Sequence, residues 1–429
     1  MRLSPDLLGH LNESECMKKI AYLSCVTCGK QYDVDEVLYV CPDCGLDHGT
    51  LDVIYDYEGI LSRFSKKDLI ESDELSQWRY WEILPVTNRD LVPPLRIGWT
   101  PLYRADRMEH DLGLRHFWLK DDTGNPSASL KDRASVMAAV RAAELGKDVV
   151  TGASTGNAAT SMSCVSAYMG LKAYIFVPER APKAKVAQLL IYGATVIMVQ
   201  GSYDQCFGLC WEASQRWGWY SRNTAINPFL SEGKKTAALE ICEQLNWQVP
   251  DKVFCSVGDG CIFGGLHKGF VDFHRLGFID RVPQLIGVQA EGAAPLVKAF
   301  EEGWPEIKPQ EADTIADSIC VGYPRDQIKA LRAVRETGGR FIAVSDDDIL
   351  AAQRRMARAT GVFGEPAGVT ACAGVIKMKE AGALDPDERI VALVTGHGLK
   401  DVESAMKAVE TSPIMVKPDI EDIAAKLAL

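Results

Sequence analysis

Predicted strands and helices alternate along the chain from Asp121 onward. Val136, Met137 and Val140 fall on one face of a helix predicted over residues 131–145, and Gly146 is a typical residue to end it. The same reasoning predicts helices over 157–169, 182–192 and 203–217, and buried strands over 148–153, 173–177, 195–199, 252–257, 284–289 and 389–394. Repeated strand and helix units predict an α/β fold, in which a parallel sheet carries helices on both faces. Ligands of such sheets bind beyond the carboxyl ends of the strands.

Two regions precede this alternation. Residues up to about 57 are polar, contain short predicted strands and carry paired cysteines. Residues 75–120 are rich in tryptophan and proline, and we expect them to form an extended connection.

The paired cysteines have the spacing of a metal site. The four residues are Cys25, Cys28, Cys41 and Cys44, and a glycine follows each pair, at Gly29 and Gly45. Four thiolates in two tight turns can surround one Zn²⁺ tetrahedrally. A closed site of four cysteines leaves no position for substrate, so the predicted zinc is structural.

Charge and composition exclude several classes of partner. The chain has 47 Lys and Arg against 58 Asp and Glu, a net charge of −11, which argues against nucleic acid as the main partner. Residues 1–13 lack the apolar core and cleavage site of a signal peptide. No apolar run approaches the roughly 18 residues of a membrane span. We therefore expect a cytoplasmic protein that binds neither membranes nor nucleic acid, with its 13 cysteines present as thiols and metal ligands.

Lys131 is the strongest candidate for a reactive group. It stands at the start of a predicted helix among small residues, and Ser154, Thr155, Gly156 and Asn157 follow one helix and one strand later. A lysine in such a turn suits an amine that forms a Schiff base with a carbonyl cofactor.

A glycine-rich turn lies between a predicted buried strand and a helix. Its residues are Gly258, Asp259, Gly260, Cys261 and Ile262. Backbone amides of such a turn bind phosphate, although glycines required only for packing are the alternative. Phe263 stands where the dinucleotide fingerprint needs a glycine, so a phosphate of a cofactor other than NAD is predicted. Thr395, at the end of the 389–394 strand, would present a hydroxyl to the same region.

Taken in order, these motifs resemble threonine synthase and its relatives, the fold type II enzymes that depend on pyridoxal 5′-phosphate (PLP). The resemblance spans residues 51–57, 78–80, 100–102, 129–133, 154–157, 232–236, 365–367 and 395–401. It implies two doubly wound parallel-sheet domains with an N-terminal zinc ribbon. The implied limits are 1–60 for the ribbon segment, 61–135 with 227–429 for a large PLP-binding domain, and 136–226 for a small α/β domain.

The resemblance also implies roles for the residues. Lys131 would carry PLP and act as general base, Asn157 would bind the ring hydroxyl, and Thr395 would meet the pyridine nitrogen. Ser154, Thr155 and Gly156 would hold the substrate carboxylate, and the turn from Gly258 to Ile262 would hold the cofactor phosphate. The implied reaction converts O-phosphohomoserine and water to threonine and phosphate by γ-elimination and β-addition. A homodimer is usual for these relatives.

One departure from the family bears on the substrate. The family commonly places an arginine for the substrate phosphate where this chain has Leu230. Either another cation substitutes, from Lys183, Lys185 and Lys234, or the substrate differs. The alternatives are a cysteate synthase-like β-replacement on O-phosphoserine, a serine or threonine dehydratase, and a zinc-ribbon binding module on an inactive scaffold.

Overall fold

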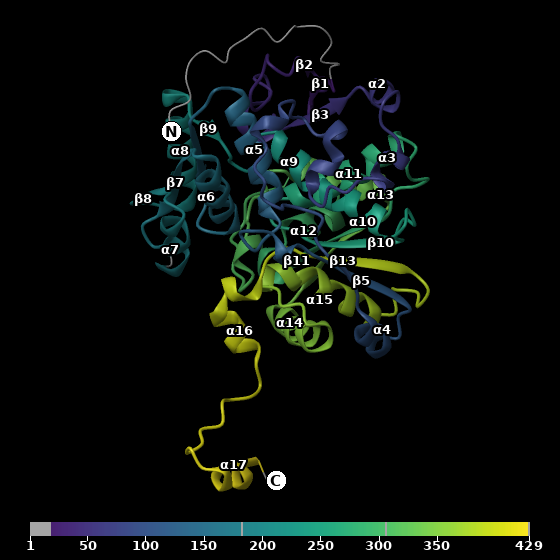
Figure 1. Ribbon diagram of the computed structural model, residues 1–429, viewed down its shortest axis with the longest axis vertical. Coiled ribbons are helices and arrows are strands. Elements are labelled where there is room, and N and C mark those ends of the chain that lie inside the picture. The colour runs from purple at the N-terminus through teal and green to yellow at the C-terminus, as the bar shows by residue number, and fades with distance from the viewer. Residues whose placement is uncertain (1–18, 182, 305–306, 428–429) are drawn as a thin grey trace.

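The computed structural model describes residues 19–181, 183–304 and 307–427 (Figure 1). It contains a six-stranded sheet, a four-stranded sheet and a three-stranded sheet. The predicted α/β class with parallel sheets is confirmed. Pro182, the first residue of the helix predicted over 182–192, and the segment 1–13 lie outside the described residues.

The six-stranded sheet, here the large sheet, has the order β12-β11-β10-β13-β5-β4. Its strands are β4 (Leu102–Arg104), β5 (His116–Asp121), β10 (Lys252–Ser256), β11 (Gln284–Ala290), β12 (Arg340–Val344) and β13 (Arg389–Val394). All neighbours are parallel except β4, which pairs with β5 antiparallel at the edge.

Helices cover both faces of the large sheet, as Figure 1 shows. On one side lie α9 (Phe229–Lys234), α10 (Thr236–Gln244), α11 (Cys261–Arg275) and α13 (Gln327–Thr337); on the other lie α4 (Asp106–Leu112), α14 (Asp346–Thr360) and α15 (Pro366–Glu380). Successive side chains of a strand point to opposite faces. Accordingly, Val253 and Cys255 of β10 join one apolar core, and Phe254 between them joins the other.

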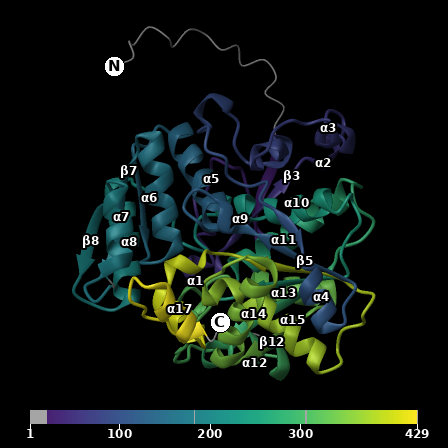
Figure 2. The ribbon, with the colours of Figure 1, turned by 60° about the horizontal axis from the view of Figure 1, so that its bottom comes forward.

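The four-stranded sheet, here the small sheet, is parallel throughout, with the order β8-β7-β6-β9. Its strands are β6 (Val149–Ala153), β7 (Lys172–Pro178), β8 (Thr195–Val199) and β9 (Tyr220–Ser221). The helices between them are α6 (Asn157–Met169), α7 (Lys183–Ile191) and α8 (Tyr203–Trp217), which group to one side of the molecule in Figure 2. Helix α5 (Lys131–Glu144) packs against both α6 and α9, and so joins the two units.

The N-terminal sheet is antiparallel, with β1 (Ile20–Cys25) between β2 (Gln31–Tyr32) and β3 (Leu51–Tyr55). The short helix α1 (Gly45–His48) lies between β2 and β3, and α2 (Tyr57–Leu61) and α3 (Lys66–Ile70) follow β3. Asp52 of β3 pairs with Lys329 at 3.1 Å and Arg332 at 2.7 Å, both on α13. Tyr55 donates its hydroxyl to Glu232 of α9 (2.6 Å). The N-terminal sheet therefore packs against α9 and α13, which cover one face of the large sheet.

The expectation that residues 75–120 form an extended connection is wrong. They contain the 3₁₀ segment Gln77–Ile83, helix α4, strand β4 and most of β5, which lies beside β13 in the large sheet. Strand β5 was not predicted from the sequence, because it contains Lys120 and a lysine is rarely buried inside a sheet. In the structure Lys120 is fully buried and pairs with Glu240 at 2.6 Å.

The remaining helices are α12 (Pro295–Glu302), α16 (Val402–Ala408) and α17 (Ile420–Leu427). Helix α17 lies at the end of an extended segment, apart from the rest of the chain in Figure 1. Among the described helices, none combines the length and the apolar character needed to cross a bilayer.

Candidate active site

The loops that carry the predicted site residues meet at one cavity of about 680 Å³. Strands β10, β13 and β5 are adjacent and parallel, so the loops after them leave the same edge of the large sheet. The loops after β6 and β9 of the small sheet face this edge. Of the predicted residues, the cavity wall includes Lys131, Ser154, Thr155, Gly156, Asn157, Gly258, Asp259, Gly260, Cys261, Ile262 and Thr395.

Lys131 is fixed against the Thr395 turn by backbone hydrogen bonds. The Leu130 amide donates to the Thr395 carbonyl (2.9 Å), and the His397 amide donates to the Ala128 carbonyl (3.1 Å). Ala128 adopts a left-handed φ of 60°, which turns the chain into α5. Burial, and then the nearby cations Lys234 and Arg222, lower the pKa of Lys131 to about 8. A lysine amine with this pKa is partly neutral near pH 8 and can act as a nucleophile or base.

The first turn of α5 is held by a buried charge network. Arg133 binds Asp122 through Nε (2.7 Å) and Nη2 (2.8 Å), and binds both oxygens of Glu240. Lys120 pairs with the same glutamate, so two cations face two carboxylates. All four side chains are inaccessible to solvent. This network fixes the backbone directly after Lys131.

The glycine turn after β10 is tightly packed and leads into an uncapped helix. Gly260 has φ of 92°, and a Cβ there would lie 2.9 Å from the Asp326 carbonyl oxygen. A Cβ at Gly258 would lie 2.9 Å from the Ile319 Cα. Packing therefore requires both glycines. The N-cap residue of α11 is Gly260, and no side chain among the described residues caps this helix start, so its first amides remain donors for an anion.

The turn after β6 offers a second uncapped helix start. Helix α6 begins at Asn157, with Gly156 at its N-cap and no side-chain cap. The Gly156 amide donates to Ser154 Oγ (3.1 Å), which holds the turn in shape. Asn157 donates Nδ2 to Glu365 Oε1 (2.6 Å). Burial raises the pKa of Glu365.

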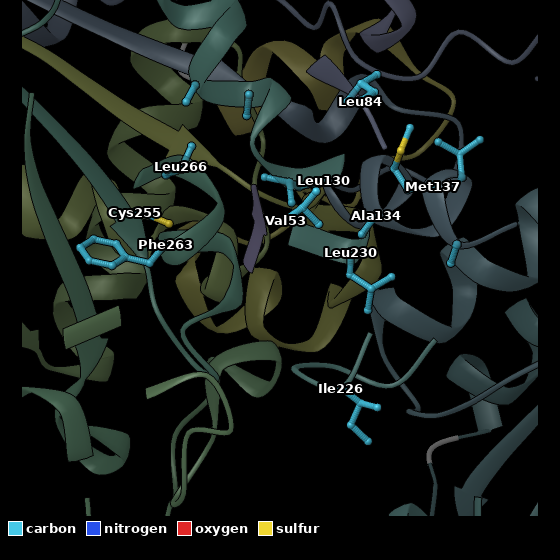
Figure 3. Packing of buried hydrophobic residues seen from close by; sticks show 14 of the residues in the cluster. Val53, Leu84, Leu130, Ala134, Met137, Ile226, Leu230, Cys255, Phe263 and Leu266 are labelled. Atoms are coloured by element: carbon cyan, nitrogen blue, oxygen red, sulfur yellow. The ribbon is translucent and has the colours of Figure 1, made fainter. Parts of the chain in front are cut away.

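Leu230 does not face the cavity. It is 1% exposed and packs in the apolar core, where Figure 3 shows it near Ala134. Of the three lysines considered as substitutes, Lys183 is exposed on α7, and Lys185 pairs with Asp317 at 2.5 Å. Only Lys234, one turn after Leu230 on α9, lines the main cavity.

Sequence reasoning missed Arg222. It follows the two-residue strand β9, lines the cavity and is 3% exposed. Nothing in its local sequence marks it, since a single arginine after a short polar strand is usually a surface residue.

The four cysteines predicted to bind zinc converge. The sulfur atoms of Cys25, Cys28, Cys41 and Cys44 all lie within 4.8 Å of one another. Gly29 and Gly45 have φ of 74° and 70°, and their amides donate to the carbonyls of Cys25 and Cys41. Tyr32 places its hydroxyl 3.0 Å from Cys41 Sγ. The donor set and its spacing suit a tetrahedral metal ion.

Comparison with known proteins gives one consistent family. A family model described as pyridoxal-phosphate dependent enzyme matches residues 94–396. The threonine synthase of Methanocaldococcus jannaschii is 43% identical over 92% of this chain and 96% of its own length. That of Methanosarcina acetivorans is 37% identical over 94% and 97%. The processed form of threonine deaminase isoform 2 from Solanum lycopersicum shares the fold, with a TM-score of 0.65 and 22% identity over 82% of this chain and 95% of that one. The chain therefore belongs to the threonine synthase family of pyridoxal-phosphate-dependent lyases.

Proposed function

We propose that this chain is a threonine synthase that converts O-phosphohomoserine and water to threonine and phosphate by γ-elimination and β-addition. The observation that carries the proposal is the identity with threonine synthases along nearly the whole chain. It is supported by a cavity in which a buried amine faces two uncapped helix starts.

The cavity residues fit PLP. Lys131 supplies the amine that would hold it, and the uncapped start of α11 supplies amides for its phosphate. Asn157 would bind the ring hydroxyl, and Thr395 would meet the pyridine nitrogen. The proposed phosphate-binding residues are Gly258, Asp259, Gly260, Cys261 and Ile262. When bound, PLP acts as an electron sink that stabilises the charge left at the substrate Cα after proton loss.

The chain's own residues would orient the substrate and move its protons. Ser154, Thr155 and Gly156, with the start of α6, would hold the substrate carboxylate and so direct its Cα toward Lys131. The Lys131 amine would take the Cα proton, because its lowered pKa leaves a neutral fraction near neutral pH. Thr395 is a neutral hydroxyl and cannot keep the ring nitrogen protonated as an aspartate would. This favours elimination and replacement over transamination.

Leu230 is the observation that favours a second candidate. Without the family's arginine, β-replacement on O-phosphoserine or dehydration of serine or threonine comes into question. Assays of the PLP-loaded enzyme separate these reactions. We expect phosphate and threonine from O-phosphohomoserine, with little cysteate from O-phosphoserine and sulfite and little oxo-acid from serine or threonine. Cysteate or oxo-acid as the main product, with no phosphate from O-phosphohomoserine, would refute the proposal.

Two variants test the role of Lys131. Lys131→Ala should lose the visible absorbance of the lysine-bound cofactor together with phosphate release. Lys172→Ala, at an exposed lysine on β7 that pairs with Asp148, is the matched control and should keep both.

We further propose that Cys25, Cys28, Cys41 and Cys44 bind a structural Zn²⁺, which would stabilise the N-terminal sheet. We also propose the domain limits that the family resemblance implies, which are 1–60, 61–135 with 227–429, and 136–226. A homodimer and a cytoplasmic location stay predictions.

A further inference from the structure

Two buried cations on the cavity wall, Arg222 and Lys234, have no carboxylate partner in the part of the chain that the structure describes. Arg222 is 3% exposed and Lys234 is 2% exposed. Arg222 Nε donates to Ser135 Oγ (3.2 Å), but its Nη2 finds no partner among the residues that the structure describes. Within the same residues, no ion pair joins Arg222 or Lys234 to a carboxylate.

Neighbouring buried cations, in contrast, form ion pairs with carboxylates. Lys235, the next residue, pairs with Glu232 at 2.5 Å and Asp272 at 2.7 Å. Lys329 pairs with Asp52 at 3.1 Å. Burying a cation without a partner is costly, so proteins seldom do it without a function. The unpaired state of Arg222 and Lys234 therefore points to an anionic ligand.

The two cations reach the cavity from different units. Arg222 follows β9 of the small sheet, and its Cδ lies 3.9 Å from the position of a Cβ on Gly152 of β6. Lys234 ends α9, and its Cβ would be 2.9 Å from a Cβ on Gly265 of α11. An anion between them would lie in the cavity that Lys131 also lines.

The other anions of the proposed reaction already have neutral donors. The start of α11 would bind the cofactor phosphate, and the start of α6 would bind the substrate carboxylate. Asp259, the acidic residue of the glycine turn, accepts the Arg325 amide (3.3 Å). A further group of about two negative charges would match the two remaining cations, and a phosphate monoester has this charge near pH 7.

We propose that Arg222 and Lys234 together bind the phosphate of the substrate, in place of the arginine that Leu230 replaces. This assignment rests on the proposed function. It makes the two residues determinants of specificity for a phosphorylated amino acid.

The test uses the PLP-loaded enzyme with the variants Arg222→Gln and Lys234→Gln. Lys172→Gln, at an exposed lysine on β7 that pairs with Asp148, is the matched control. Each charge-assisted hydrogen bond contributes about 1.5–3 kcal/mol, which corresponds to roughly a 10- to 150-fold change. We expect the KM for O-phosphohomoserine to rise by this factor in both variants and to stay unchanged in the control.

Binding of inorganic phosphate, measured by calorimetry, provides a readout that does not depend on catalysis. Phosphate should bind the wild-type holoenzyme and raise its Tm, and both variants should lose this response. Without phosphate, the variants should melt no lower than wild type, because they lose an unpaired charge. Arg222→Lys should bind phosphate more weakly than wild type but more tightly than Arg222→Gln. If Arg222→Gln does not fold, the loss of affinity in Arg222→Lys relative to wild type provides the test.

The outcomes distinguish the assignment of the anion site from the proposed reaction. If wild type releases phosphate from O-phosphohomoserine and both variants keep its KM, the assignment of Arg222 and Lys234 is overturned while the proposed function stands. If phosphate binding depends on both residues but no phosphate is released from O-phosphohomoserine, the anion site stands and the proposed function falls. Loss of bound PLP from Lys234→Gln would place that lysine on the cofactor phosphate and overturn the pair.

Discussion

Replacing Arg133 with methionine should destabilise the fold and loosen the start of α5. The guanidinium bridges Asp122 and Glu240 with no exposure to solvent, and it also donates to the hydroxyl oxygens of Thr236 (2.8 Å) and Thr100 (3.1 Å). Methionine fills similar volume but leaves two buried carboxylates facing only Lys120. Breaking a buried pair by removing one partner costs about 3–5 kcal/mol, a fall of roughly 150- to 5000-fold in the folded-to-unfolded ratio.

Urea unfolding followed by circular dichroism measures this loss, and the visible absorbance of bound PLP measures the effect on Lys131. The double variant Arg133→Met with Asp122→Asn removes the orphaned charge, so it should recover a large part of the stability. Arg281→Met removes an exposed arginine paired with Asp251 and should cost below about 1 kcal/mol. A loss below about 1 kcal/mol in Arg133→Met, or no recovery in the double variant, would refute the account of this network.

Three other predictions concern the amine, the metal and the cavity wall. The rate at which the apoenzyme binds PLP should rise with pH through about 8, because the buried Lys131 amine is neutral above this pKa; a midpoint near that of an exposed lysine, about 10.4, would contradict it. Removing zinc with a chelator, or replacing Cys28 with serine, should lower the Tm and expose the N-terminal sheet to proteases, since the free energy of metal binding contributes to folding. A metal-free protein with an unchanged Tm and an unchanged rate of proteolysis would count against a structural zinc. Glu365→Ala should lower kcat/KM, since the buried Asn157 amide loses its acceptor at a cost of about 1–3 kcal/mol. Glu365→Gln should keep much of the wild-type kcat/KM, because its amide oxygen can accept the same hydrogen bond. Equal losses in both variants would show that this hydrogen bond does not support activity.

The sequence pattern predicted the small sheet well. Helices over 157–169 and 203–217 coincide with α6 and α8. Glycines mark their ends, and Gly170 and Gly218 have the left-handed φ values of 69° and 66° that favour this residue. Local periodicity and helix-ending glycines were sufficient for these helices, but the two-residue strand β9 at the edge of the same sheet was not predicted.

The large sheet was predicted less completely. Strand β5 was missed because Lys120 interrupts its apolar run, and only the distant Glu240 makes that lysine compatible with burial. A partner 120 residues away cannot be recognised from local sequence.

The cavity shows a similar division. Lys131, Asn157, the glycine turn and Thr395 were expected from motifs, and the structure places all of them on one cavity wall. Arg222 was not expected, because its burial follows from the packing of β9 beside β6. Residue type at position 230 indicated a lost arginine, but the direction of that side chain, into the core, depends on how α9 packs.

The stoichiometry of products from O-phosphohomoserine tests the central claim most directly. With the PLP-loaded wild-type enzyme, threonine and phosphate should appear in equal amounts, and Lys131→Ala should form neither. Phosphate without threonine would indicate elimination without addition of water. Absence of both products from an enzyme with bound PLP would contradict the proposed reaction.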